Sequence, residues 1–231
     1  CARIIEARNY RFFYICAMYR KENKPQTHCL RCGTCCEKGG PALHTDDLEL
    51  VLQQAIPASG LYTIRRGEFV RDNINGGLFE TPREIIKIKS APDTGACAYY
   101  DSAHNGCRIY DRRPLECRAM QCWDTTAIKR IYAANRIDRS AVFGRVQWLM
   151  DLIDDHETRC SYDLLRDLVQ RRERGESGAA EKILEIIRYD KSIRETFTEK
   201  DAANAGMLNL VFGRPLAETV PKQFGIRLQR T

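Results

Sequence analysis

The sequence lacks several features that would place it in a broad class at once. It has no run of about eighteen apolar residues, which argues against a membrane-spanning helix. It has no internal repeat and no low-complexity segment, which argues against a solenoid or a flexible linker. No signal segment is visible, so we expect a cytoplasmic protein, although the sequence does not tell what precedes Cys1.

Common catalytic fingerprints are also missing. The chain has no Gly-rich dinucleotide-binding or phosphate-binding loop, no His-Glu-x2-His motif and no Cys-x3-Cys-x2-Cys run of radical enzymes. Its formal charge of +6 over 231 residues is mild, so a nucleic-acid partner is not supported. Neither a substrate nor an oligomeric state follows from these patterns, and whether the protein is an enzyme stays open.

What is present is an ordinary globular composition, with 43% hydrophobic and 29% charged residues. The segment 2–22 has the spacing of an amphipathic helix, and cysteine is concentrated before residue 124. We therefore expect three regions: an N-terminal helix at 1–22 that packs on the core, a cysteine-cluster metal-binding domain at 23–124 and a helical C-terminal region at 125–231.

The expected fold is α+β and mostly helical, with a small cysteine-rich core wrapped by helices from both ends of the chain. The Ile/Lys alternation at 85–89 and the Asn-Gly-Gly turn at 75–77 predict a short antiparallel sheet or hairpin. Apolar periodicity predicts five helices, over 45–55, 138–155, 161–172, 178–190 and 198–213. Capping patterns place Thr45 at the start of the first helix and Thr198 at the start of the last, which Gly213 ends.

Eleven cysteines are the most informative feature of the sequence. Eight fall in two clusters, and only Cys1, Cys16 and Cys160 lie outside them. A disulfide framework would spread its cysteines along the chain, and cysteines that merely fill a core would be fewer. The clustering therefore indicates metal ligands, which also fits a reducing compartment. We expect Cys16 and Cys160 to be small buried side chains.

The first cluster is Cys29-x2-Cys32-x2-Cys35-Cys36. A Cys-x2-Cys turn aims two sulfurs at one metal, as in zinc knuckles and iron–sulfur loops, and three cysteines at this spacing are close to the run of bacterial ferredoxins. We expect the adjacent Cys35 and Cys36 to point in different directions, and so to serve two metal centres or two irons of one polynuclear site. A strained vicinal disulfide is the alternative.

The second cluster supplies four more thiols, Cys97, Cys107, Cys117 and Cys122. Four plus four gives eight, the number that two centres of four thiolates need. Arginines interleaved with this cluster are placed to offset the negative charge of such centres: Arg108, Arg112, Arg113 and Arg118.

Two histidines and several aromatic residues lie near the clusters. His28 and His104 are more typical of neighbours of a metal site than of its ligands. We expect the aromatic residues to pack over the metal sites, although a stacking surface is the alternative: Tyr99, Tyr100, Tyr110 and Trp123.

The combined pattern resembles the bacterial and archaeal CxxCxxCC cysteine-cluster family, whose members are described as zinc- or iron-chelating domains. The run "CLRCGTCC" and the later "CRIYDRRPLEC" carry the resemblance, which covers about 29–122. The resemblance implies that the clustered cysteines bind a metal, and Cys122 fits the family pattern less closely than the others. It also implies residues that surround the ligands without binding the metal: Tyr110, Arg113, Pro114 and Arg118. Flagellin lysine-N-methylases are distantly similar.

Iron and zinc both accept tetrahedral thiolate ligands. The Cys-x2-Cys-x2-Cys run, and the lack of a further Cys-x2-Cys pair downstream, favour iron–sulfur clusters over zinc. We expect clusters of the [4Fe–4S] type, two in number. The first hypothesis is thus an iron–sulfur protein for electron transfer or redox catalysis, with a redox or protein partner. The second is a structural zinc module that presents an interaction surface for a protein or nucleic acid. The third is a methyltransferase-like enzyme with the same metal domain.

Overall fold

The computed structural model describes residues 26–72, 74, 76–200 and 202–227. The chain divides into two units, Cys1–Leu30 and Arg31–Thr231. The helix expected at 1–22, with Cys1 and Cys16, lies outside the described residues. The domain boundary expected at 124 lies inside the second unit and stays a prediction.

The strands of the described residues form three separate antiparallel pairs, which confirms the expected short sheet or hairpin. The first pair is central and joins β1 to β4, with Leu61 opposite Ile88. In β4 the apolar residues Ile86 and Ile88 are buried, as their alternation predicted. The bounds are β1 (Leu61–Ile64) with β4 (Ile85–Ile88), β2 (Phe69–Arg71) with β3 (Leu78–Glu80), and β5 (Tyr100–Asp101) with β6 (Gly106–Cys107).

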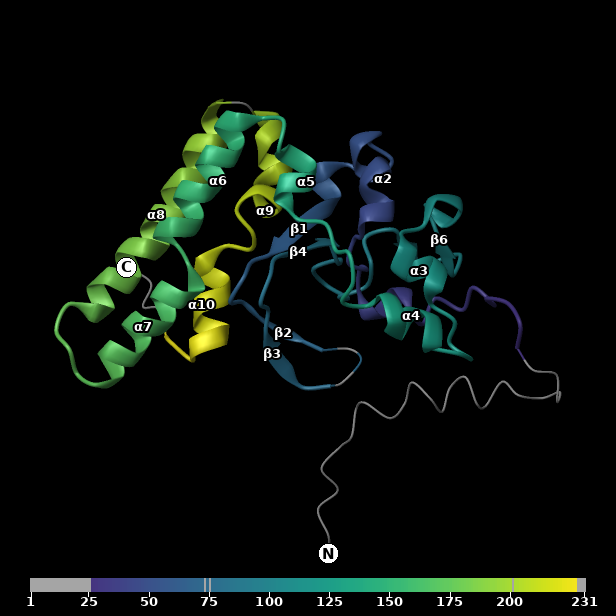
Figure 1. The fold of residues 1–231 in the computed structure, drawn as a ribbon, viewed down its shortest axis with the longest axis horizontal. Helices are drawn as coiled ribbons and strands as arrows, with labels where there is room; N and C mark the ends of the chain where they lie inside the picture. The colour runs from purple at the N-terminus through teal and green to yellow at the C-terminus, as the bar shows by residue number, and fades with distance from the viewer. Residues whose placement is uncertain (1–25, 73, 75, 201, 228–231) are drawn as a thin grey trace, which may run out of the picture. The chain divides into compact units, whose positions relative to one another are not determined.

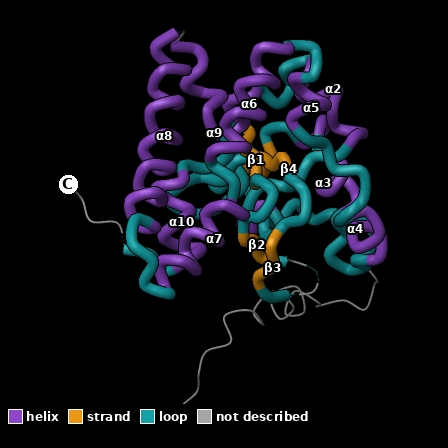
Figure 2. The backbone as a smooth tube through the Cα atoms, turned by 60° about the vertical axis from the view of Figure 1, so that its left-hand side comes forward, coloured by secondary structure: helices purple, strands orange, loops and turns teal. Residues whose placement is uncertain are grey.

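Helices surround the β1–β4 pair, so the fold is α+β and mostly helical, as expected (Figures 1 and 2). In the second unit, α2 to α4 lie on one side of this pair and α6 to α8 on the other (Figure 1). The helices are α2 (Leu48–Leu52), α3 (Leu115–Ala119), α4 (Thr126–Ile131), α5 (Arg139–Phe143), α6 (Gln147–Arg159), α7 (Tyr162–Glu173), α8 (Ala179–Lys200), α9 (Leu208–Val211) and α10 (Leu216–Phe224).

Single 3-10 turns complete the described secondary structure. They are η1 (Cys36–Lys38), η2 (Thr45–Asp47), η3 (Ala58–Gly60), η4 (Tyr110–Arg112) and η5 (Ala202–Met207). No helix of the described residues has the length and apolarity that crossing a bilayer requires.

Two predicted helix caps are wrong. The helical segment after the first cluster begins at η2, and His44 is its N-cap, in a capping box with Asp47, where Thr45 was expected. Thr198 lies inside α8 and donates its hydroxyl to the Arg194 carbonyl at 3.0 Å. The capping pattern at Thr198 involves only neighbouring residues. Helix α8 nevertheless continues past Thr198, because the apolar face of α8 is buried as far as Phe197.

The core consists of two main clusters. One joins β1 and β4 to α5, α6 and α9, and it includes Cys97. The other joins α7, α8 and α10, and it includes Cys160, which is fully buried as expected. The cysteine-rich segment is therefore anchored on the main core through Cys97.

Buried charges also hold the second unit together. Arg65 is fully buried and donates to both carboxylate oxygens of Glu157 at 2.8 Å. Arg139, only 3% exposed, donates to the same carboxylate at 2.6 Å and also to Glu84. Although burial would raise the pKa of Glu157, the charges of the two arginines lower it to about 2. Glu157 of α6 thus connects Arg65, which directly follows β1, with Arg139 of α5 through one carboxylate.

We predict that Glu157→Gln lowers the free energy of unfolding by about 3 kcal/mol, because it leaves two buried guanidinium groups short of negative charge. Urea denaturation at pH 7 measures this loss. Glu195→Gln breaks only the exposed pair with Lys191 and serves as the control, with a loss below about 1 kcal/mol. Since the pKa of Glu157 is depressed, its contribution is complete above its ordinary value of 4.5 and disappears as pH falls toward 2. An equal loss in both variants would contradict the prediction.

Candidate metal centre

The loop of the first cluster turns at Gly33 and then becomes helical. Gly33 has a φ of +76°, a conformation that glycine adopts without strain. Its carbonyl accepts from the Glu37 amide at 3.0 Å, and Cys35 leads directly into η1. This tight turn brings the last two cysteines of the cluster onto the start of a 3-10 turn.

Cys35 and Cys36 are close enough for their thiols to affect each other's ionisation. Cys35 has a right-handed helical backbone at the start of η1. A hydrogen bond to the Cys36 thiol lowers the pKa of Cys35 to about 6, and the same bond raises the pKa of Cys36. That the two side chains serve different metal atoms stays a prediction.

Three cysteines of the second cluster reach the first cluster through separate elements. The Cys97 amide donates to the Cys36 carbonyl at 2.8 Å, which joins the two clusters through the backbone. Cys107 lies in β6 opposite Tyr100 of β5. Cys117 lies in the middle of α3.

Five thiols interact electrostatically and form what we call the inner thiol group: Cys35, Cys36, Cys97, Cys107 and Cys117. Burial raises the pKa of Cys97 and of Cys117, and the charges of the neighbouring thiols raise both further. Several thiolates side by side repel one another, so this group cannot ionise together without cations. A thiophilic metal ion would supply that charge, and thiolates are the kind of ligand that such an ion prefers.

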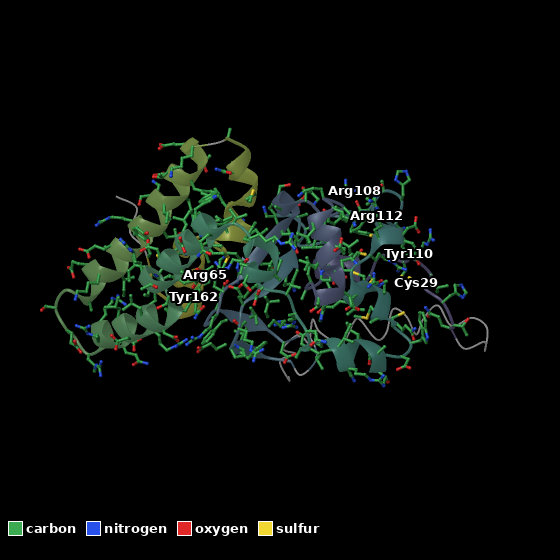
Figure 3. The ribbon with its side chains drawn as sticks, turned by 45° about the horizontal axis from the view of Figure 1, so that its top comes forward. Cys29, Arg65, Arg108, Tyr110, Arg112 and Tyr162 are labelled. Carbon is green, nitrogen blue, oxygen red and sulfur yellow. The ribbon has the colours of Figure 1, made fainter. Side chains whose placement is uncertain are left out.

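Two of the arginines expected beside the clusters, Arg108 and Arg113, act on thiols of the inner thiol group. The charge of Arg113 lowers the pKa of Cys35, and the charge of Arg108 lowers that of Cys97. Arg113 lies 3.6 Å from the ring centroid of Tyr110 and donates to its carbonyl at 2.7 Å, and Arg31 lies 4.0 Å from the same ring. Figure 3 places Arg108, Tyr110 and Arg112 together at the end of the second unit that carries α3.

A buried polar network, which the sequence analysis missed, fixes α3. Glu116, next to Cys117, accepts from the Ala42 amide at 2.9 Å and contacts the His44 ring at 3.3 Å. Asp47 is fully buried and accepts from the amides of His44 at 3.0 Å and Leu115 at 2.8 Å, so it caps α3 from another segment. Although burial lowers the pKa of His44, its bonds to Glu116 and to the Ala134 carbonyl outweigh burial and raise it.

Tyr100 is a second contributor whose place the sequence did not reveal. A Cβ atom added to Gly33 would lie 2.1 Å from the Tyr100 hydroxyl oxygen, so the phenol occupies the space that the missing side chain leaves. The hydroxyl donates to Asn105 at 3.0 Å, and the Tyr100 backbone pairs with Cys107. Tyr100 therefore connects the Cys32–Cys35 turn with the hairpin that carries Cys107. A glycine inside Cys-x2-Cys was the only sequence signal.

The remaining predicted site residues lie at the margins. Cys29 belongs to the unit Cys1–Leu30, while Cys32 and Cys122 are exposed residues of the second unit, and the Cys32 sulfur lies 3.3 Å from the Thr34 hydroxyl. His104 is exposed and pairs with Asp101 at 2.8 Å. Within the described residues, no three Cys, His, Asp or Glu side chains have the arrangement that holds an ion, so the ligand set of eight cysteines stays a prediction.

Comparison with known protein families bears directly on this donor set. Residues 28–136 match the family model described as "CxxCxxCC: Putative zinc- or iron-chelating domain". Over these residues the chain is similar to the CxxCxxCC family. The match includes every cysteine of the inner thiol group, and also β1 to β4, Glu116 and α4. The CxxCxxCC domain thus supports metal binding, with zinc and iron both compatible.

No curated protein matches the chain significantly, and neither does any solved structure. The distant similarity to flagellin lysine-N-methylases is therefore not supported by these comparisons.

We predict that Gly33→Ala lowers metal affinity about tenfold, because the new methyl group displaces Tyr100 and shifts the cysteines on either side of the turn. Metal competition with a chelator measures the change. Gly95→Ala is the matched control, because Gly95 also has a positive φ, +73°, but has no atom within 4 Å of an added Cβ. If both variants lost affinity equally, backbone strain alone would account for the effect and the Tyr100 contact would be irrelevant.

Proposed function

We propose that this chain is an iron–sulfur protein whose clustered cysteines hold more than one metal atom and serve electron transfer or redox catalysis. The proposed ligands are Cys29, Cys32, Cys35, Cys36, Cys97, Cys107, Cys117 and Cys122. One observation carries the proposal: the five thiols of the inner thiol group exceed the four positions of a single tetrahedral ion. Eight cysteines would complete two [4Fe–4S] centres.

The adjacent residues Cys35 and Cys36 favour a polynuclear arrangement, because two neighbouring sulfurs reach one mononuclear ion only with distortion of the backbone. A cluster bound here would supply one-electron transfer. The protein contributes the charge balance: Arg108 and Arg113 offset the negative charge of the thiolates. It also contributes rigidity, because Asp47 and Glu116 hold α3 in place.

The compartment and the partners belong to the same proposal. Eight reduced cysteines persist in a reducing compartment, which favours the cytoplasm. A redox enzyme or carrier protein would exchange electrons with the cluster. A structural zinc module is the competing function, since the same donor set accepts zinc.

The metal content of protein purified without oxygen tests the choice of metal. We predict a brown protein with broad visible absorbance and with iron and acid-labile sulfide in near-equal amounts. A colourless protein with about two zinc ions per chain would contradict the proposal and establish the zinc module. Addition of dithionite should bleach the visible absorbance, which a zinc protein does not show.

Single serine replacements test the ligand set. We expect Cys97→Ser, Cys107→Ser and Cys117→Ser each to lower the metal content, whereas Cys160→Ala, a change at a buried cysteine outside the clusters, leaves it unchanged. Cys35→Ser and Cys36→Ser are measured in the same way. If these two variants each lost the same single metal atom and nothing else, the proposal of more than one metal atom would be wrong.

A further inference from the structure

A groove in the helical part of the second unit belongs to no function considered so far. It has a volume of about 610 Å³ and lies between α8 and the segments around α9 and α10. Its wall is mainly apolar, formed by Ile187, Leu208, Pro215 and Ala217 and by the aliphatic parts of charged residues of α8. Figure 1 shows α8 and α10 on the opposite side of β1 and β4 from α3, which carries Cys117.

Arg194 is the buried cation in the lining of this groove. It is only 7% exposed, and its guanidinium is held on two sides. Nε donates to Asp190 at 3.0 Å, and Nη2 donates to the carbonyls of Phe212 and Gly213, both at 3.1 Å. The third nitrogen, Nη1, is buried and has no hydrogen-bond partner among the described residues. Such a donor favours an acceptor from outside the chain.

The charges around Arg194 decide which kind of acceptor suits Nη1. Asp190 is 2% exposed and binds Arg194, the His156 ring at 2.8 Å and the Leu216 amide at 3.0 Å. The Asp190 carboxylate and the Arg194 guanidinium therefore cancel each other. Burial lowers the pKa of His156, so this ring adds no charge at neutral pH.

The rim of the groove adds no net charge either. Arg188 and Lys191 contribute two positive charges, and Glu195 and Glu199 contribute two negative ones. A carboxylate buried beside Arg194 would thus be an uncompensated charge, which is costly in an apolar surrounding. A neutral oxygen avoids this cost and still accepts from Nη1.

We propose that this groove binds an apolar molecule that carries one uncharged carbonyl, which accepts a hydrogen bond from Nη1 of Arg194. The volume lies in the range of small-molecule sites, and a mainly apolar wall with one fixed donor is the usual composition of such sites. The site is independent of the metal centre proposed above.

Isothermal titration of the full chain with 2-octanone and with octanoate tests the site. The two probes have the same number of carbons and differ in the charge at the oxygen end. We expect 2-octanone to bind saturably, one molecule per chain, and octanoate to bind at least about tenfold more weakly. Absence of saturable 2-octanone binding, or octanoate binding as tight as 2-octanone, would overturn the proposal.

Location is tested by Ala217→Phe, which fills the groove from an exposed position of α10. This variant should weaken 2-octanone binding at least about tenfold, whereas Ala127→Phe, an equivalent change at an exposed position of α4, should leave it unchanged. Amide shifts of the unaltered chain give a readout that does not depend on a variant: 2-octanone should shift Ile187, Arg194 and Leu208. Equal binding by both variants, or shifts confined to other helices, would contradict the assignment.

Discussion

The mutual repulsion of closely placed thiolates is the constraint on which this structure depends. The inner thiol group brings five sulfurs into one electrostatic environment, and burial further raises the pKa of Cys97 and Cys117. Such a group is unfavourable when ionised, although Cys97 itself packs in the main core. A thiophilic cation would relieve the repulsion, which is consistent with the metal binding that the family match supports.

The scaffold holds this group together by connections that do not involve the cysteine side chains. The bond from the Cys97 amide to the Cys36 carbonyl joins the two clusters, and the β5–β6 pair presents Cys107. Asp47 and Glu116 fix α3 by accepting from backbone amides at 2.8 and 2.9 Å. Because these contacts order the backbone beforehand, less conformational entropy is lost when a metal binds.

Sequence reasoning reached the α+β class, the Ile86/Ile88 face and the cysteine clusters, because local spacing encodes each of them. Sequence reasoning failed where contacts between distant segments determine the local structure. His44 replaced Thr45 as a cap because its capping box with Asp47 is completed by tertiary contacts to Glu116. Sequence reasoning also did not reveal the 3-10 turn that follows Gly33 and carries Cys36, because residue spacing does not specify that turn.

The central claim is that one crowded set of thiols binds more than one metal atom. X-ray absorption of the anaerobically purified protein tests this most directly, because it reports both the ligand atoms and any neighbouring metal. The account predicts an iron edge with sulfur as the first neighbour and with a clear iron–iron contribution beyond it. A single metal surrounded by four sulfurs, with no metal–metal contribution, would contradict it.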